Sequence, residues 1–299
     1  MAATGKRIGS ARRAAYAKIN LYLDVLSCRE DGFHDLLTVM HSISLCDDVQ
    51  VEWAEASETA ITLSVVGARL PHDAKNLAYR AAALFLSTTG QQAAIRITLR
   101  KRIPIAAGLA GGSSDAAAVL RAMQGLSPVA VEEETLLRMG LSLGSDVPFC
   151  LVGGTQICRG RGERMQPLAC GAPLSLVVAK GREHVSTARA FSDMDAYFHN
   201  FDGSVAHGGR PQELYRAMAA GKLHMASAAI YNAFEPVILP ACPTATALRA
   251  QLLELGAYAA CMSGSGPSVF GLFATPGQAR RAAAAIGRYA FLATSAPAL

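Results

Sequence analysis

A stretch rich in glycine, alanine and serine, residues 104–115, stands directly before an alanine-rich segment. Glycine can adopt positive φ and lets a ligand approach the backbone closely, so successive N–H groups can converge on an anion. Ser113 and Ser114 are N-cap candidates for a helix over the alanine-rich residues that follow. The free N–H groups and the positive dipole end of that helix would point at the same anion. The pattern predicts a phosphate-binding loop, with a tight strand-to-helix turn as the alternative.

The loop matches neither common nucleotide-binding motif, because no Gly-Lys-Ser/Thr closes it and no Gly-x-Gly-x-x-Gly follows a single strand in a βαβ unit. Taken whole, it resembles the Pro-x-x-x-Gly-Leu-x-x-Ser-Ser loop of the GHMP kinases, named for galactokinase, homoserine kinase, mevalonate kinase and phosphomevalonate kinase. The resemblance implies that this loop binds ATP. The residues so implied are Pro104, Ala106, Ala107, Gly108, Leu109, Ala110, Gly111, Gly112, Ser113 and Ser114.

Apolar and polar side chains alternate over residues 17–25, which predicts a half-buried strand. Lys18 and Asn20 fall on one face of that strand, roughly 6.5 to 7 Å apart between Cα atoms, so they can serve one ligand. The alternative is that this face simply meets solvent. The strand and the Arg-Glu-Asp-Gly-Phe-His-Asp-Leu run at 29–36 resemble the first motif of one GHMP branch, the 4-diphosphocytidyl-2-C-methyl-D-erythritol kinases. The different first motif of the sugar-kinase relatives is absent.

In that branch, the lysine that matches Lys18 and the aspartate that matches Asp146 form the catalytic pair. Asp146 lies in a Gly-Ser-Asp-Val-Pro run that resembles the branch's Gly-Ala/Ser-Asp-Val-Pro element. Without the resemblance, an aspartate in this context is more often a turn or cap residue. The resemblance implies that Lys18 orients the substrate hydroxyl, while Asp146 accepts its proton or holds it for attack on the γ-phosphate.

The resemblance assigns the cytosine of the substrate to Phe33, which would stack on it, and to His34, which would hydrogen-bond its edge. The branch usually has tyrosine where this chain has Phe33. The segment at 185–191 resembles the branch's Val-Ser-Thr segment, and its Phe191 is expected to form a second aromatic wall. The glycine turn at 263–267 resembles the third GHMP motif and is expected to supply a further contact. Packing and a plain hairpin turn are the alternatives. The remaining substrate contacts implied are Asn20, Asp146, Thr187, Phe191, Gly264, Ser265 and Gly266.

Asn76 has two interpretations. The Lys-Asn-Leu run at 75–77 resembles an Asp-Asn-Leu element whose asparagine lies near the adenine of ATP, and a helix N-cap explains Asn76 equally well. Asn76 is therefore a candidate ATP-binding residue.

The elements that must position these residues follow from periodicity, glycine and proline. Besides the strand at 17–25, strands are expected at 60–66, 95–100, 174–179, 257–262 and 268–273. Helices are expected at 76–86, 114–124, 130–142, 212–220, 224–231, 243–255 and 277–290, with residues 144–148 ending helical structure and a loop at 200–212. The mixture of elements fits an α+β fold. We expect a disordered basic tail over 1–13, an N-terminal GHMP domain over 14–160 that binds ATP, and a C-terminal GHMP domain over 161–299.

Composition limits the classes of protein. The chain has 299 residues of which 51% are hydrophobic, enough for two domains, and no run approaches the ~18 apolar residues that span a bilayer. Seven scattered cysteines without a Cys-x-x-Cys pair argue for reduced thiols in the cytoplasm, and against a zinc site or disulfide framework. A net charge of +5 without a basic stripe disfavours nucleic acid and suits anionic, phosphorylated substrates. A monomer and a homodimer both remain open.

These expectations combine into one function. The resemblance implies an enzyme that uses ATP, with Mg²⁺ expected, to phosphorylate the 2-hydroxyl of 4-diphosphocytidyl-2-C-methyl-D-erythritol in the non-mevalonate isoprenoid pathway. The alternative is another GHMP kinase, for homoserine or mevalonate, although those substrates have no base to stack on Phe33. The Mg²⁺ ligands are open, with Ser114 as one candidate.

Overall fold

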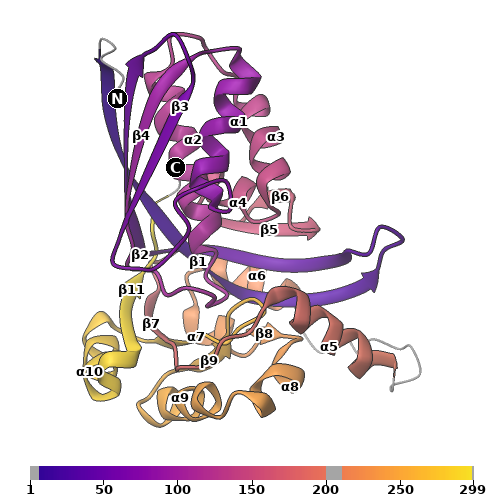
Figure 1. The fold of residues 1–299 in the computed structure, drawn as a ribbon. Coiled ribbons are helices and arrows are strands. Elements are labelled where there is room, and N and C mark those ends of the chain that lie inside the picture. Colours follow the sequence, from indigo (N-terminus) through magenta and orange to yellow (C-terminus); the bar gives the residue numbers. More distant parts are fainter. Residues whose placement is uncertain (1–6, 200–210, 298–299) are drawn as a thin grey trace.

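The computed structural model describes residues 7–199 and 211–297 (Figure 1). Its strands form a seven-stranded sheet with the order β3-β4-β2-β1-β8, in which β5 pairs with β2 and β6 with β5, and a four-stranded sheet with the order β11-β7-β10-β9. Most neighbouring strands are antiparallel, but β1 and β8 run parallel, as do β3 and β4. The α+β class with mixed sheets is confirmed.

The first sheet is built on a long hairpin and carries its helices on one face (Figure 1). Its strands are β1 (Arg7–Cys28), β2 (His34–Glu55), β3 (Ala60–Val66), β4 (Ala93–Arg100), β5 (Thr155–Gly160) and β6 (Arg164–Pro167). The helices are α1 (Leu77–Thr89), α2 (Gly111–Leu126), α3 (Glu133–Leu143) and α4 (Val147–Val152). Alternate residues of β2 and β4, such as Val51 and Ile97, pack with Phe85 and Leu120 of the helices in one buried core. The period of two in the strands and of 3.6 in the helices creates these facing apolar surfaces.

The second sheet consists of β7 (Ser175–Ala179), β9 (Ala259–Met262), β10 (Val269–Phe273) and β11 (Ala290–Thr294), whereas β8 (Tyr231–Asn232) joins the first sheet. The helices of this half are α5 (Thr187–His199), α6 (Pro211–Ala219), α7 (Leu223–Ser227), α8 (Glu235–Ile238), α9 (Pro243–Glu254) and α10 (Pro276–Ile286). Short 3₁₀ turns cover Leu239–Ala241 and Gly287–Tyr289.

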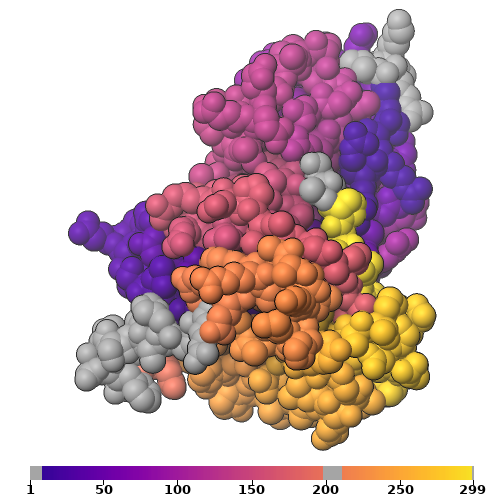
Figure 2. All heavy atoms as spheres, turned by 180° about the vertical axis from the view of Figure 1, so that it is seen from behind, coloured from indigo at the N-terminus to yellow at the C-terminus, as the bar shows by residue number. Residues whose placement is uncertain are grey.

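The two halves share a core. Ile19 of β1 and Val39 of β2 pack in one buried cluster with Leu176 and Phe270 of the second sheet. The other face of the second sheet packs against α9 and α10. Seen from behind, the orange and yellow C-terminal part lies at the opposite end of the molecule from the magenta part, with a pink to red band between them (Figure 2). Apolar packing thus fixes the two halves relative to each other.

The disordered tail expected over residues 1–13 is wrong for residues 7–13. β1 begins at Arg7 and pairs with β2 from Ala54 onward. Arg12 forms an ion pair with Asp48 of β2, with 2.5 Å between Nη2 and Oδ2. Cross-strand hydrogen bonds and this ion pair order residues 7–13, although their basic composition alone suggested a disordered tail. Residues 1–6 lie outside the described residues.

The expected domain boundary at residue 160 also shifts. β6 pairs with β5, so the first sheet continues as far as Pro167. β8 adds a short C-terminal strand to β1. The two halves are therefore interwoven through the first sheet.

Most expected elements are confirmed to within a few residues, but three local expectations differ. The polar face of the strand over 17–25 is buried, because Lys18, Asn20 and Asp24 are all covered. Residues 144–148 end α3 and also start α4, in which Pro148 occupies the first turn, where its missing N–H costs nothing. The loop expected at 200–212 lies outside the described residues up to 210, and residues 211–212 belong to α6. Among the helices of the described part, none has the length and apolar character needed to cross a membrane.

Candidate active site

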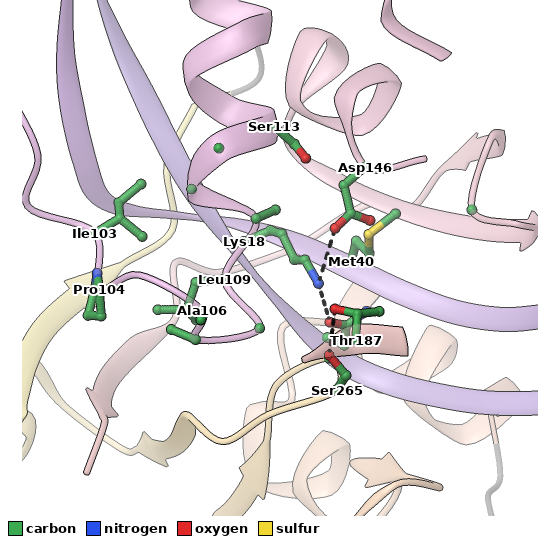
Figure 3. A pocket seen from close by; sticks show the side chains of 18 of the residues that line it. Lys18, Met40, Ile103, Pro104, Ala106, Leu109, Ser113, Asp146, Thr187 and Ser265 are labelled. Carbon is green, nitrogen blue, oxygen red and sulfur yellow. Dashed lines mark hydrogen bonds and ion pairs between the residues drawn. The ribbon is translucent and has the colours of Figure 1, made fainter. Parts of the chain in front are cut away.

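A cavity of about 410 Å³ opens between the two halves, and residues from both line it (Figure 3). The loop before α2 forms one wall, and β1 and β2 form the floor. Asp146, Arg161, Thr187, Phe191 and the turn at 264–265 complete the lining.

The loop has the backbone of an anion site. Ala106, Gly108 and Ala110 all have positive φ, and α2 begins at Gly111 with Ala110 as its N-cap. Alternation of left-handed with other conformations turns successive N–H groups toward one side, which is how backbone nests bind anions. No side chain caps α2, so its first N–H groups remain available to a ligand. The expectation that Ser113 or Ser114 is the N-cap is wrong, since both lie inside the helix.

The two serines have different surroundings. Ser113 lines the cavity near Asp146 (Figure 3). Ser114 is buried, and its hydroxyl donates to the carbonyl oxygen of Tyr16 at 2.6 Å. Ser114 therefore ties α2 to β1 and does not face the cavity.

Gly108 allows the loop to contact the turn that follows β9. A Cβ atom on Gly108 would lie 2.1 Å from the carbonyl oxygen of Ser263, so only glycine fits there. The Ser263 hydroxyl donates to the Gly108 carbonyl at 3.1 Å and accepts from the backbone N–H of Asn20 at 3.3 Å. One serine thus connects the phosphate loop, β1 and the second half. Gly264 and Ser265 of the same turn line the cavity, and Gly266 does not.

Lys18 and Asp146 face each other across the cavity floor (Figure 3). The Lys18 Nζ lies 3.8 Å from the Asp146 Oδ2, and their side chains are 5% and 37% exposed. Lys18 also donates to the Asn20 Oδ1 at 2.7 Å, and Asn20 donates in turn to the Thr38 Oγ1 at 2.8 Å. The Lys18 backbone N–H donates to Leu109 of the loop at 3.2 Å. A buried ammonium is thereby held beside an accessible carboxylate, next to the anion loop.

A second lysine lies behind the loop, and sequence reasoning missed it. Lys101 donates to Asp47 and to Asp115 at 2.5 Å each, and all three side chains are nearly fully buried. Burial raises the pKa of Asp115 to about 7, and Asp47 raises it as well, against the lowering effect of Lys101. Asp47 also accepts from the backbone N–H of Ile103 at 2.8 Å. This cluster fixes the junction between β4 and the phosphate loop. In the sequence, the Lys-Arg pair at 101–102, just before the loop, could have indicated it.

The other end of the cavity is aromatic. Phe191 lines it and stacks on His34, with ring centres 4.6 Å apart and planes at 23°. The His34 Nε2 lies 2.6 Å from the Asp195 Oδ1. Phe33 is 44% exposed, and the Arg161 guanidinium lies over its ring at 3.5 Å from the ring centre. Neither Phe33 nor His34 lines the cavity directly, although both touch residues that do.

Asn76 is the N-cap of α1, because its side chain accepts from the backbone N–H of Ala78 at 3.0 Å. It is not a lining residue, whereas the neighbouring Leu77 is. Thr187, as expected, faces the cavity, and its hydroxyl lies 3.1 Å from the Ser265 hydroxyl. Sequence reasoning missed further lining residues, among them Leu36, Thr38, Met40, Arg161 and Phe234. The first three alternate along β2, and that alternation could have indicated them.

Comparison with known proteins decides the family. The model for the GHMP kinases N terminal domain matches residues 76–154, and that for the GHMP kinases C terminal matches residues 207–291. A 4-diphosphocytidyl-2-C-methyl-D-erythritol kinase of Pelotomaculum thermopropionicum is 43% identical over 270 residues, which cover 90% of this chain and 91% of the relative. The chain belongs to this family of GHMP kinases.

Solved structures agree with that placement. A 4-(cytidine 5'-diphospho)-2C-methyl-D-erythritol kinase has a TM-score of 0.80 and 36% identity, over 96% of this chain and 100% of its own. A homoserine kinase from Cytophaga hutchinsonii has a TM-score of 0.71 at 21% identity, over 97% of this chain and 95% of its own. The second likeness concerns the fold alone.

Proposed function

We propose that this small-molecule kinase transfers the γ-phosphate of ATP to the 2-hydroxyl of 4-diphosphocytidyl-2-C-methyl-D-erythritol, giving the 2-phosphate and ADP. The reaction belongs to the non-mevalonate pathway of isoprenoid precursors. The observation that carries the proposal is the Lys18–Asp146 pair, 3.8 Å apart beside the anion loop, in a chain whose relatives bear this enzyme's name.

The loop supplies the phosphate site in this proposal. Its N–H groups and the uncapped N-terminus of α2 bind the phosphates and stabilise charge on the transferred group. Phosphoryl transfer demands mostly positioning and charge neutralisation, so little covalent chemistry falls to the protein. Apolar Leu70 and Leu77 line the cavity beside the loop and suit the adenine.

Lys18 and Asp146 act on the acceptor. Asp146 is the accessible member of the pair and takes a hydrogen bond from the hydroxyl, whose proton it accepts or holds as the oxygen attacks. Lys18, fixed by Asn20, neutralises the charge that builds up on that oxygen.

The oxygen atoms at this end of the cavity fit Mg²⁺, which prefers oxygen ligands and keeps several waters. Ser113 is the residue that would hold it, since its hydroxyl lines the cavity beside the loop and Ser114 is buried against Tyr16. When bound with ATP, the ion neutralises phosphate charge.

The test is a panel of alcohols assayed for ATP-dependent ADP release, with the 4-diphosphocytidyl compound, homoserine and mevalonate each at matched concentration. We expect turnover with the cytidyl compound alone, and a product whose phosphate is on the 2-hydroxyl by NMR. Turnover of homoserine or mevalonate without the cytidyl compound would refute the proposal.

A further inference from the structure

The charges around the cavity leave one cation without a carboxylate. Three cationic side chains line it, those of Lys18, Lys101 and Arg161. Lys18 faces Asp146, and Lys101 is held between two aspartates. Within residues 7–199 and 211–297, no carboxylate lies within ion-pair distance of Arg161, and nearby Asp31 is paired with Arg29 at 3.0 Å. Arg161 is therefore the lining cation that no ion pair among these residues neutralises, and an anionic substrate can use its charge.

The guanidinium of Arg161 is held at a defined place. Its Cζ lies over the Phe33 ring, 3.5 Å from the ring centre, and its Nη2 donates to the Ser145 hydroxyl at 3.3 Å. Ser145 directly precedes Asp146 in the chain, so Arg161 extends from the catalytic pair toward the aromatic end.

The backbone around Arg161 is fixed as well. Its N–H donates to the Glu163 Oε2 at 2.6 Å, and the next N–H, from Gly162, donates to the Arg159 carbonyl at 3.1 Å. The Arg161 Nε is buried and has no hydrogen-bond partner in the described structure. A buried donor without a partner is costly, and the packing around Arg161 bears that cost to keep the guanidinium in this place.

We propose that Arg161 binds the diphosphate of the cytidyl substrate and so makes the enzyme specific for a diphosphate-linked alcohol. The inference rests on the function proposed above. In that substrate the diphosphate joins the nucleoside to the alcohol that is phosphorylated. Arg161 contacts Ser145, which precedes Asp146, and Phe33, which precedes the His34 that stacks on Phe191, so it links the two ends of the cavity. A planar guanidinium matches phosphate oxygens with parallel hydrogen bonds, and stacking on an aromatic ring preorganises it.

The arrangement also changes the role expected of Phe33. The ring face covered by Arg161 cannot stack on a base at the same time. Phe33 thus acts through Arg161 as a positioning residue, and Phe191 remains as the ring that lines the cavity.

The experiment compares two competitive inhibitors, cytidine and cytidine 5'-diphosphate, against the cytidyl substrate in the full-length enzyme. Arg161→Gln should weaken the diphosphate about 10- to 100-fold, the range for losing charged hydrogen bonds, and leave cytidine within about twofold. Arg161→Lys keeps the charge but loses the paired donors of the guanidinium, so its affinity for the diphosphate should lie between those of the wild type and Arg161→Gln. The KM for ATP should not change.

Arg159→Gln is the matched control, because Arg159 lies two positions away on the same segment, is exposed and does not line the cavity. It should leave both inhibition constants unchanged. Equal weakening of cytidine and its diphosphate by Arg161→Gln would overturn the assignment, and so would no change in either. A wild-type enzyme that binds neither compound would overturn the proposed function itself, and this assignment with it.

Discussion

Asp146 differs from its partner in accessibility, and the difference assigns the roles. Its side chain is 37% exposed and projects into the cavity, whereas the Lys18 side chain is 5% exposed and already donates to Asn20. A group that must exchange protons with a substrate needs access, while a group that neutralises charge gains from burial, where the effective dielectric constant is low.

Replacing Asp146 with Asn should therefore lower kcat by about 10²- to 10⁴-fold, the range for a positioned acid or base, and leave ATP affinity largely intact. Steady-state kinetics give the first quantity, and calorimetry with a non-hydrolysable ATP analogue gives the second. Asp193→Asn, which changes an α5 aspartate outside the cavity lining, is the control. Near-normal kcat in the Asp146 variant would contradict its role.

For single residues, the sequence predicts those that belong to a motif and misses those whose role arises only from tertiary contacts. Lys18, Asn20 and Asp146 meet as predicted, since a strand register and one short motif suffice to place them. Lys101 and Arg161 were missed, because their roles depend on which segments lie opposite. Asn76 caps a helix, one of the two interpretations its sequence allowed.

The backbone of the phosphate loop departs from the conformations that its residues prefer. Ala106 and Ala110 have φ values of 50° and 56°, a conformation that costs an L-residue about 1 to 2 kcal/mol. The contact of Gly108 with the 263–266 turn, along with the hydrogen bond from Lys18 to Leu109, holds the loop in this shape. The helix start at Gly111 could not be predicted from propensity, because alanine is a poor N-cap and two serines stood nearby.

Gly112 offers a test of this element without disturbing the fold. A Cβ there would meet only the Leu77 Cδ1, at 3.7 Å, so the protein has room for a side chain that would occupy the phosphate site. Gly112→Val should weaken ATP binding by at least about 10-fold, on the order of 1.4 kcal/mol, with little loss of thermal stability.

The matched control is Gly277→Val, which adds the same side chain to the first turn of α10, with no atom closer than 3.7 Å. It should change helix propensity in the same way and leave ATP binding unchanged. Unaltered ATP affinity in Gly112→Val, measured by calorimetry, would mean that the loop is only a structural turn.

On the scale of the whole molecule, His41 connects the two halves. It lies in β2, fully buried, and bonds Thr155 of β5 through Nδ1 at 2.7 Å and Ser295 through Nε2 at 2.9 Å. Ser295 follows β11 and also accepts from the Leu174 N–H at 2.9 Å. Neither this link nor β11 was predicted, because β11 depends on pairing with β7 of the second sheet and the link depends on Ser295 reaching β2.

Burial lowers the pKa of His41 from its ordinary value of 6.5 to about 4. The unfolded chain therefore binds a proton at higher pH than the folded protein, and folding stability falls as pH drops from 6.5 toward 4. Between pH 7 and pH 5 this one group should remove about 2 kcal/mol from the free energy of unfolding. His41→Gln keeps a donor and an acceptor for Thr155 and Ser295 but cannot titrate, so urea unfolding should show a smaller loss over the same interval. His224→Gln, at an exposed histidine, should keep the wild-type loss, and an equal loss in all three proteins would show that His41 does not set the acid sensitivity of the interface.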